Sequence, residues 1–219
     1  MNKKVIITDV DGVLVKWQSM LPFFAQEKGI DLKDILSCQY SEEFIHTKDL
    51  FKCTPEFSRI LKKEYHNSDW IRYLSAYNDA LEVINKLKED YTFIAVTALE
   101  KSETALRNRS YNLNTLFTGV FSEIHLTDND KESTFLHILA EQCESGNDVV
   151  AYIDDLAEHL LSFERALETI KLANYKLAPV KIQLARGKRD KYIFEDKYTY
   201  RAKDWFDVKE ILVNKKYGF

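Results

Sequence analysis

The sequence has 219 residues but few of the residue types that mark special scaffolds: three cysteines, three prolines, six glycines and two methionines. Cys38, Cys53 and Cys143 lie far apart, are odd in number and lack metal-ligand spacing. We therefore expect no disulfide framework and no cysteine metal site, and we expect a reducing environment. The scarcity of proline and glycine predicts regular helices and strands joined by short connections.

Long apolar runs are also missing from the sequence. No stretch approaches the roughly 20 apolar residues that a membrane-spanning helix needs. The short apolar stretch after the N-terminal lysines is interrupted at Asp9 and Asp11, which is not the pattern of a signal peptide. These absences predict a cytoplasmic protein with no membrane partner.

A strong net charge is absent as well. The 31 Lys and Arg residues nearly balance the 35 Asp and Glu residues, which leaves a formal net charge of −4. A protein without a basic excess has no broad surface field for nucleic acid, so a nucleic-acid partner is the weaker expectation. One basic cluster, Arg186-Gly187-Lys188-Arg189 with Lys191, could contact a polyanion, although a solvated loop explains it as well.

The composition, with 45% hydrophobic and 30% charged residues, is that of a folded globular protein. Short apolar or β-branched runs predict strands at residues 5–10, 91–97, 120–126, 149–153, 180–184 and 198–202. Apolar residues at three- and four-residue spacing predict helices at residues 80–89, 104–108, 132–143, 156–172 and 205–213. Strands that alternate with helices indicate βαβ units. We therefore predict an α/β fold with a Rossmann-like core, in which a parallel sheet carries helices on both faces.

The segment between the first and second predicted strands has a different pattern. It predicts helices at residues 21–29, 32–36, 42–51 and 55–65, and it is far longer than the dozen or so residues that a crossover needs. An inserted helical cap is the economical explanation. The predicted organisation is a core of residues 1–16 and 81–219 with a helical cap of residues 17–80.

Two carboxylates follow the first predicted strand, in the segment Asp9-Val10-Asp11-Gly12-Val13. Side chains alternate along a strand, so residues two apart can converge on one point. Close carboxylates repel one another unless a cation lies between them, and hard oxygen ligands suit Mg²⁺. The alternative is that both Asp residues only form a turn.

Three further polar signals lie at or near the carboxyl ends of strands, where open α/β sheets bind ligands. Thr97 ends the second strand, although a threonine is as readily a helix cap. Lys131 precedes the helix at residues 132–143, and alone it would be a solvated lysine. The adjacent pair Asp154-Asp155 is more specific, because two acids at the tip of a buried strand are costly unless a positive charge lies there.

Together and in this order, these residues resemble the motifs of the haloacid dehalogenase-like (HAD) hydrolase superfamily, in particular its phosphatase branch and nucleotidase-like members. Asp9-Val10-Asp11-Gly12-Val13 resembles the first motif, Thr97 the second, Lys131 the third and Asp154-Asp155 the fourth. The helical insertion after the first motif resembles the cap of that family. The resemblance covers most of the chain.

The resemblance implies a phosphoric monoester hydrolase. Asp9 would attack phosphorus and form an aspartyl-phosphate, and Asp11 would protonate the leaving oxygen and then deprotonate the hydrolytic water. Family members that cleave carbon–halogen bonds generally lack this second acid, so its presence favours phosphate chemistry. Thr97 would hydrogen-bond a phosphoryl oxygen, and Lys131 would offset the negative charge of Asp9 and of the phosphate.

Mg²⁺ is the cofactor that the resemblance implies. Its site would comprise Asp9, the backbone carbonyl of Asp11 and the acids of the fourth motif, Asp154 and Asp155. Asp154 is the preferred direct ligand because it is common to the known variants of this motif. Asp155 is the second choice and Glu158 the third.

Other residues near these motifs have plainer explanations. Lys101 competes with Lys131 as the lysine of the phosphate site. Arg107 and Arg109 could reach a substrate, but arginines on a helix surface are far commoner. The histidines show no pairing at ligand spacing, so each is expected to be structural or exposed: His46, His66, His125, His137 and His159.

Aromatic residues at the entrance to the predicted cap bear on the substrate. Trp17, Phe23 and Phe24 could stack on a base, and the alternative is that they form the hinge and the core of the cap. We expect a small phosphomonoester as substrate, with a nucleoside monophosphate as the leading candidate. A polynucleotide 3′-phosphatase, a phosphomutase and a catalytically silent binding domain are the alternatives. The sequence does not predict the oligomeric state.

Overall fold

The computed structural model describes residues 3–41, 45–173, 175, 177–186 and 199–216. Its centre is a sheet of six strands in the order β3-β2-β1-β4-β5-β6, and all neighbouring strands pair in parallel. The strands are β1 (Lys4–Thr8), β2 (Thr92–Ala98), β3 (Phe121–Thr127), β4 (Asp148–Asp154), β5 (Val180–Leu184) and β6 (Thr199–Ala202). The predicted α/β fold with a parallel sheet is confirmed.

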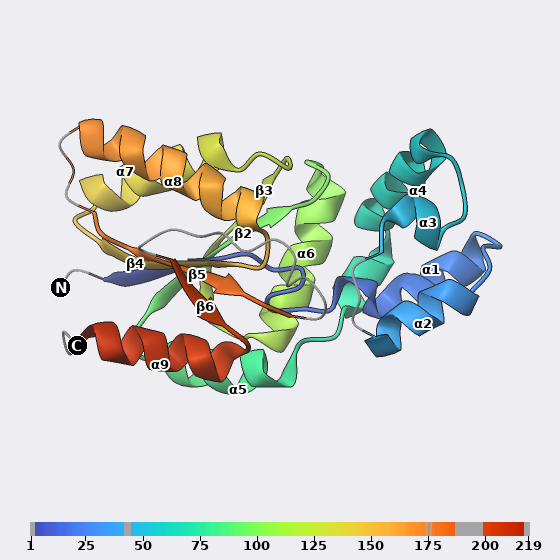
Figure 1. Cartoon of the computed structure of the whole chain (residues 1–219), viewed down its shortest axis with the longest axis horizontal. Helices are drawn as coiled ribbons and strands as arrows, with labels where there is room; N and C mark the ends of the chain where they lie inside the picture. Colours follow the sequence, from blue (N-terminus) through green and yellow to red (C-terminus); the bar gives the residue numbers. More distant parts are fainter. Residues whose placement is uncertain (1–2, 42–44, 174, 176, 187–198, 217–219) are drawn as a thin grey trace.

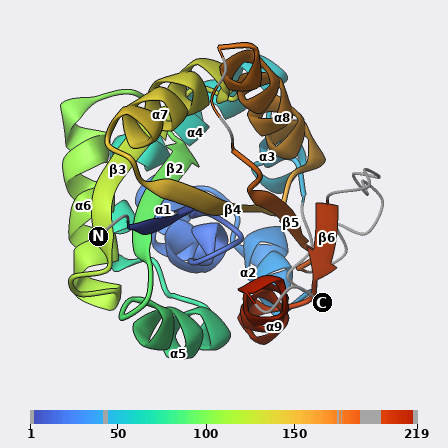
Figure 2. The ribbon, with the colours of Figure 1, turned by 90° about the vertical axis from the view of Figure 1, so that its left-hand side faces the viewer.

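Helices cover both faces of this sheet (Figures 1 and 2). One face carries α7 (Glu132–Glu144) and α8 (Ala157–Leu172), and the other carries α5 (Asn78–Leu87), α6 (Glu103–Leu116) and α9 (Trp205–Lys216). Alternating side chains in the strands hold the two layers. Val5 and Ile7 pack with the α7–α8 layer, whereas Ile6 between them packs with the opposite layer. Within the described ranges, no helix is both long and apolar enough to cross a membrane.

The chain builds the sheet outward from β1 in both directions. It first adds β2 and β3 on one side of β1, and then returns through α7 to add β4, β5 and β6 on the other side. The connections therefore diverge between β1 and β4. In open α/β sheets, ligands bind outside the carboxyl ends of the strands at such a switch point.

The segment between β1 and α5 forms a helical insertion (residues 17–77) that lies at one end of the sheet (Figure 1). It contains the 3-10 helices η1 (Trp17–Met20) and η2 (Asp69–Tyr73) and the α-helices α1 (Leu21–Glu27), α2 (Lys33–Ser41), α3 (Thr47–Leu50) and α4 (Pro55–Asn67). α4 begins as the sequence suggests, because Thr54 accepts a hydrogen bond from Phe57 N and Pro55 occupies the first turn.

The predicted helix at residues 42–51 is too long. Residues 42–44 lie outside the described part of the chain, and α3 covers only Thr47–Leu50 of the remainder. His46 is extended, with ψ of 137°, and Lys52 has a positive φ of 50°. Neither conformation continues an α-helix.

Two adjacent chain segments connect the insertion to the sheet. Val15 pairs antiparallel with Ala76, and Lys16 N donates a hydrogen bond to Ser75 O at 2.8 Å. Gly12, just before this crossing, has φ of 85°, which glycine adopts without a steric penalty. The predicted boundary after residue 80 falls inside α5, and the division into two domains stays a prediction.

Candidate active site

Asp9 lies directly after β1, at the switch point of the sheet. Its backbone N–H donates a hydrogen bond to Ile153 O at 2.8 Å, which fixes the end of β1 against β4. The side chain is buried, and its Oδ1 accepts a hydrogen bond from Lys131 Nζ at 2.6 Å. Burial raises the pKa of Asp9 to about 6, although the charge of Lys131 acts in the opposite direction.

Lys131 is fully buried beneath Asp9, at the residue that precedes α7. Its ammonium group donates to Asp9, to Asp154 Oδ2 at 2.8 Å and to Val96 O at 3.1 Å. These three acceptors match the three N–H donors of a lysine. Burial alone would lower the pKa of Lys131, but the two carboxylates raise it, so this lysine stays charged.

Asp154 ends β4 and is completely buried. Its carboxylate accepts hydrogen bonds from Lys131, from the Tyr152 hydroxyl and, at 2.8 Å, from Leu156 N. His159 Nδ1 lies 3.0 and 3.1 Å from its two oxygens. Burial would raise the pKa of Asp154, but the positive charges of Lys131 and His159 outweigh burial and hold the pKa below its usual value.

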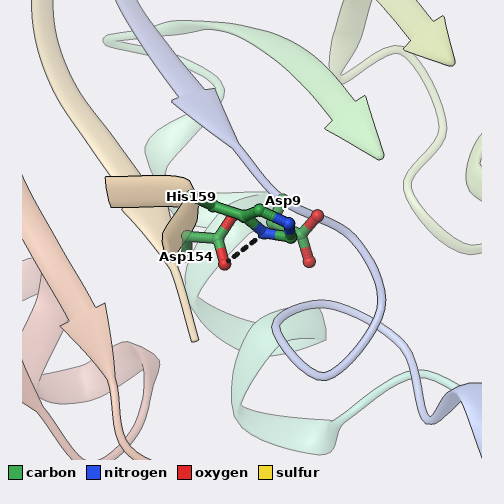
Figure 3. A group of neighbouring side chains, drawn as sticks. All are labelled: Asp9, Asp154 and His159. Atoms are coloured by element: carbon green, nitrogen blue, oxygen red, sulfur yellow. Dashed lines mark hydrogen bonds and ion pairs between the residues drawn. The ribbon is translucent and has the colours of Figure 1, made fainter. Parts of the chain in front are cut away.

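His159 is a site residue that the sequence pattern did not indicate. Figure 3 shows its ring between the carboxyl groups of Asp9 and Asp154. Burial lowers the pKa of His159, but Asp154 raises it by more. These three residues each offer one ligand atom, and the atoms lie within 4.8 Å of one another, so the group could hold a divalent metal. The sequence feature that could have indicated His159 is its position in the first turn of α8, where side chains tilt back toward the strand end.

Asp11 lines the same cavity as Asp9 but pairs with a different cation. Arg109 Nη2 donates to both carboxylate oxygens of Asp11 at 2.7 Å, and the Thr97 hydroxyl donates to Oδ2 at 3.4 Å. Arg109 lies on α6 and is completely buried. The expectation that it is a helix-surface arginine is therefore wrong, although it holds for Arg107, which is exposed.

Of the two candidate lysines, the structure brings only one to the motif residues. Lys101 is half exposed and pairs with Asp128 at 2.7 Å. Lys131 instead contacts the acids of the first and fourth motifs. Thr97, at the end of β2, is buried and its side chain contacts Asp11.

A cavity of about 300 Å³ lies between the strand ends and the helical insertion. Its acidic wall contains Asp9, Asp11, Asp155 and Glu158, whereas Asp154 and Lys131 are not among its lining residues. The insertion contributes the opposite wall, which includes Trp17, Ile45, Leu50, Lys62 and His66. The cavity therefore joins the predicted motif residues to side chains of the insertion.

Trp17 is the one member of the predicted aromatic trio that lines the cavity. Its indole N–H donates to His66 Nε2 at 3.3 Å, and its ring packs edge-to-face against Tyr65. Phe24 is buried inside the insertion, and Phe23 stacks on Trp70 with ring centroids 5.3 Å apart. Phe24 therefore fits the core alternative, whereas Phe23 is 49% exposed and is not part of the core. Trp17 faces the cavity.

The predicted basic cluster is described only at its first residue. Arg186 lines the cavity, pairs with Asp79 and lies 3.9 Å from the centroid of the Tyr77 ring. Lys188, Arg189 and Lys191 lie outside the described residues. Arg186 therefore belongs to the cavity wall.

The chain is similar in sequence to a phage protein. No protein-family model matches the chain. The chain is 44% identical over 216 residues to an uncharacterized 32.4 kDa protein, from the Gp30-rIII intergenic region of Enterobacteria phage T4. The match covers 98% of this chain and 71% of the phage T4 protein.

Solved structures with the same fold are hydrolases of low sequence identity. The HAD-hydrolase YfnB from Bacillus subtilis, described as bound to magnesium, has a TM-score of 0.62 at 13% identity, with 97% of this chain and 100% of that chain covered. The L-2-haloacid dehalogenase from Xanthobacter autotrophicus has a TM-score of 0.60 at 10% identity, and the match covers 97% of this chain and 99% of that chain. A protein from Lactobacillus plantarum assigned as a phosphoglycolate phosphatase has a TM-score of 0.55 at 12% identity, and the match covers 96% of this chain and 100% of that chain.

At such low identity the solved structures show the fold, and they include both a dehalogenase and a phosphatase. The sequence match to the phage protein is much stronger and spans most of both chains. The chain therefore belongs to the family of the uncharacterized 32.4 kDa phage T4 protein, and its fold is that of the HAD-superfamily hydrolases.

Proposed function

We propose that the protein is a magnesium-dependent phosphatase that hydrolyses a small phosphomonoester through an aspartyl-phosphate. The observation that carries this proposal is that two carboxylates, Asp9 and Asp11, line one cavity while each forms an ion pair with a different buried cation. Expulsion of a halide requires a carboxylate nucleophile alone, whereas expulsion of an alkoxide also requires a proton donor. The second acid therefore favours a phosphoric ester over a carbon–halogen substrate.

The two carboxyl groups would divide the reaction between them. In the first step an oxygen of Asp9 attacks phosphorus, the bond from phosphorus to the leaving oxygen breaks, and Asp11 gives its proton to that oxygen. In the second step water attacks the same phosphorus and gives a proton to Asp11. The bond between phosphorus and Asp9 then breaks, inorganic phosphate leaves, and both side chains return to their starting state.

Lys131 and Thr97 would support these steps without forming bonds to phosphorus. The 2.6 Å contact from Lys131 fixes one oxygen of Asp9 and offsets its charge, which leaves the other oxygen for attack. The Thr97 hydroxyl makes only a long contact of 3.4 Å with Asp11, so it can turn to donate to a phosphoryl oxygen. Preformed donors of this kind stabilise charge that develops during the reaction.

The donor set around the cavity fits a divalent cation. Asp9, Asp11 and Asp155 line one cavity, and carboxylate and carbonyl oxygens are the ligands that Mg²⁺ prefers. We assign Asp9, the Asp11 carbonyl and Asp155 as the residues that would hold it. When bound, Mg²⁺ would neutralise charge on the phosphoryl oxygens.

Asp154 suits a supporting role better than a ligand role. Four donors already surround its oxygens: Lys131, Tyr152, Leu156 N and His159. To bind an ion, Asp154 would have to give up contacts with these groups. This preference reverses the order in which the sequence ranked Asp154 and Asp155.

The cavity favours a small substrate. A volume of about 300 Å³ is at the lower end for small-molecule sites, and the helical insertion covers it. The apolar side chains Trp17, Ile45 and Leu50 could receive the base of a nucleoside monophosphate, and Lys62 could contact its polar groups. A nucleoside 5′-monophosphate is therefore the leading substrate class.

A panel of substrates tests the proposal. The wild type should release phosphate from one or more nucleoside 5′-monophosphates in the presence of Mg²⁺ and not in the presence of EDTA. Asp9→Asn should lose essentially all of this activity, because an amide is not a nucleophile for phosphorus. A 3′-phosphorylated oligonucleotide and an L-2-haloacid in the same panel separate the polymer and dehalogenase alternatives. Phosphate release that survives in Asp9→Asn would show that the nucleophile is misassigned.

A further inference from the structure

Arg109 is a buried cation that the fold alone does not explain. Within the described residues, Asp11 is the only acidic group that it contacts, through Nη2. The Nε and Nη1 atoms of Arg109 are buried and make no hydrogen bond. Each buried donor without a partner costs roughly 1–3 kcal/mol, so a residue that serves only stability would be expected to pair more of its five donors.

Neighbouring residues on α6 already attach this helix to the insertion. Asn108 Nδ2 donates to Ser68 O at 2.9 Å, and its Oδ1 accepts from Arg72 Nε at 2.7 Å. Asn112 Nδ2 donates to the carbonyls of Arg72 and Leu74 at 3.1 and 2.9 Å. The contact between α6 and the insertion therefore does not need the charge of Arg109.

We propose that Arg109 is a positioning residue that holds Asp11 in the orientation needed for proton transfer to and from the leaving group. This inference rests on the proposed function, in which Asp11 is the acid and base. Arg109 and Thr97 are the only described side chains that hold the Asp11 carboxylate, and the Thr97 contact is the longer one. Without Arg109, the carboxylate would turn freely at the cavity wall.

The place of the ion pair supports a role near the leaving group. Burial and then the charge of Asp11 raise the pKa of Tyr65, and burial, Lys62 and then Arg109 lower the pKa of His66. Both of these residues belong to α4 of the insertion. The pair therefore lies where the sheet meets the insertion, and the Asp9–Lys131 pair lies against the strand ends.

The test compares leaving groups that differ in their need for a proton. Arg109→Met would be assayed with phenyl phosphate and with 2,4-dinitrophenyl phosphate, at saturating Mg²⁺. kcat/KM is the quantity of interest, because it covers the steps up to departure of the leaving group and excludes hydrolysis of the common intermediate. We expect kcat/KM to fall by about 10–100-fold for phenyl phosphate and by less than about threefold for the dinitrophenyl ester, which leaves without acid catalysis.

Three matched variants make the result specific. Arg107→Met lies on the same helix, is exposed, and should leave both values unchanged. Arg109→Lys keeps a positive charge and should recover part of the phenyl phosphate activity. In an Asp11→Asn background, Arg109→Met should cause no further loss, because a residue that acts through another loses its effect when the other is removed.

The outcomes separate this inference from the proposed function. An equal fall of kcat/KM for both esters would overturn the positioning role alone. A further fall of kcat/KM when Arg109→Met is added to Asp11→Asn would do the same. A wild type that releases phosphate from neither ester and from no nucleoside 5′-monophosphate would overturn the proposed function and this inference with it. If only a nucleotide is hydrolysed, the double-variant comparison in the Asp11→Asn background is made on that nucleotide, and a further loss from Arg109→Met there would overturn the positioning role. If Arg109→Met does not fold, Arg109→Lys takes its place, because it retains the buried charge. It should lower kcat/KM more for phenyl phosphate than for the dinitrophenyl ester, although by a smaller factor, and equal losses on both esters would again overturn the positioning role.

Discussion

The two buried cations of the candidate site differ in how completely they are paired. Lys131 uses its three donors on Asp9, Asp154 and a strand carbonyl. Arg109 uses one nitrogen on Asp11 and leaves two others buried without a partner. The first cluster lies beneath the strand ends, and the second lies where the sheet meets the helical insertion.

This difference matches two different chemical tasks. A nucleophile must stay fixed while phosphorus arrives, and the saturated network around Lys131 resists movement. A group that transfers a proton mainly needs its carboxylate held in one orientation, and a single guanidinium nitrogen that contacts both oxygens of Asp11 can do this. The comparison therefore predicts large stability losses from changes in the strand-end cluster and smaller ones from changes on the insertion side.

The largest loss is expected for Lys131→Met. Removal of the cation leaves Asp9 and Asp154 buried close together with no lysine between them. Breaking a buried ion pair by removing one partner typically costs about 3–5 kcal/mol. Urea unfolding of the metal-free protein at neutral pH measures this directly.

Lys101→Met is the matched control for that measurement. Lys101 and its partner Asp128 are 50% and 76% exposed in their side chains, so the pair contributes at most about 1 kcal/mol. The same two variants also decide which lysine supports activity. Comparable losses of stability in both variants would contradict the view that Lys131 anchors the strand-end cluster.

The next largest effect separates the two acids of the fourth motif. Asp154→Asn removes a charge that accepts hydrogen bonds from Lys131 and Tyr152, so it should cost about 2–3 kcal/mol of stability. Asp155→Asn should cost less stability but raise the Mg²⁺ concentration for half-maximal activity by at least about tenfold, because Asp155 lines the cavity. The opposite pattern, with the metal dependence changed only in Asp154→Asn, would restore Asp154 as the direct ligand.

The sequence predicted the sheet well because strand signals are local. Each of the six strands is marked by its own apolar run, and each observed strand begins and ends within two residues of its prediction. The motif acids also follow from local position, since Asp9 and Asp154 occur at the ends of such runs. The polarity and position of these residues were enough to place them near one edge of a parallel sheet.

The partners of those acids could not be predicted in the same way. Arg109 is 98 residues from Asp11 in the chain, and a charged residue on a predicted helix is most often exposed. Tyr152 belongs to an apolar run, so its hydroxyl contact with Asp154 depends on where the side chains of β4 end. Which acid faces the cavity and which faces Lys131 likewise depends on the turn after β4.

A pH effect of intermediate size is expected on the insertion side. Burial, with the charges of Lys62 and Arg109, lowers the pKa of His66 from 6.5 to about 3. The unfolded chain then binds more protons than the folded chain below pH 6.5, so stability is complete above that pH and falls as the pH drops toward 3. At pH 5 the loss from this residue is about 2 kcal/mol.

His66→Gln isolates this contribution from groups such as Asp9 that titrate in the same range. The Gln side chain can still accept a hydrogen bond from Trp17 but carries no titrating group. The free energy of unfolding is measured for the wild type and for His66→Gln at pH 5 and pH 7.5. The extra stability that the wild type loses between these pH values is the contribution of His66. A wild type that loses no more stability than His66→Gln over this range would show that His66 is not held neutral by the fold.

The smallest effect is expected for Trp17→Phe, which keeps an aromatic ring beside Tyr65 but removes the donor to His66. One neutral hydrogen bond is worth about 1 kcal/mol, or roughly 2–4 °C in Tm for a chain of this size. Trp70→Phe is the control, because its indole donates to Glu27 in an exposed contact at 3.0 Å and should matter less. A loss of several kcal/mol in Trp17→Phe would mean that the insertion-side cluster is as tightly determined as the one around Lys131. The sparse pairing of Arg109 would then no longer indicate that this cluster contributes less to stability.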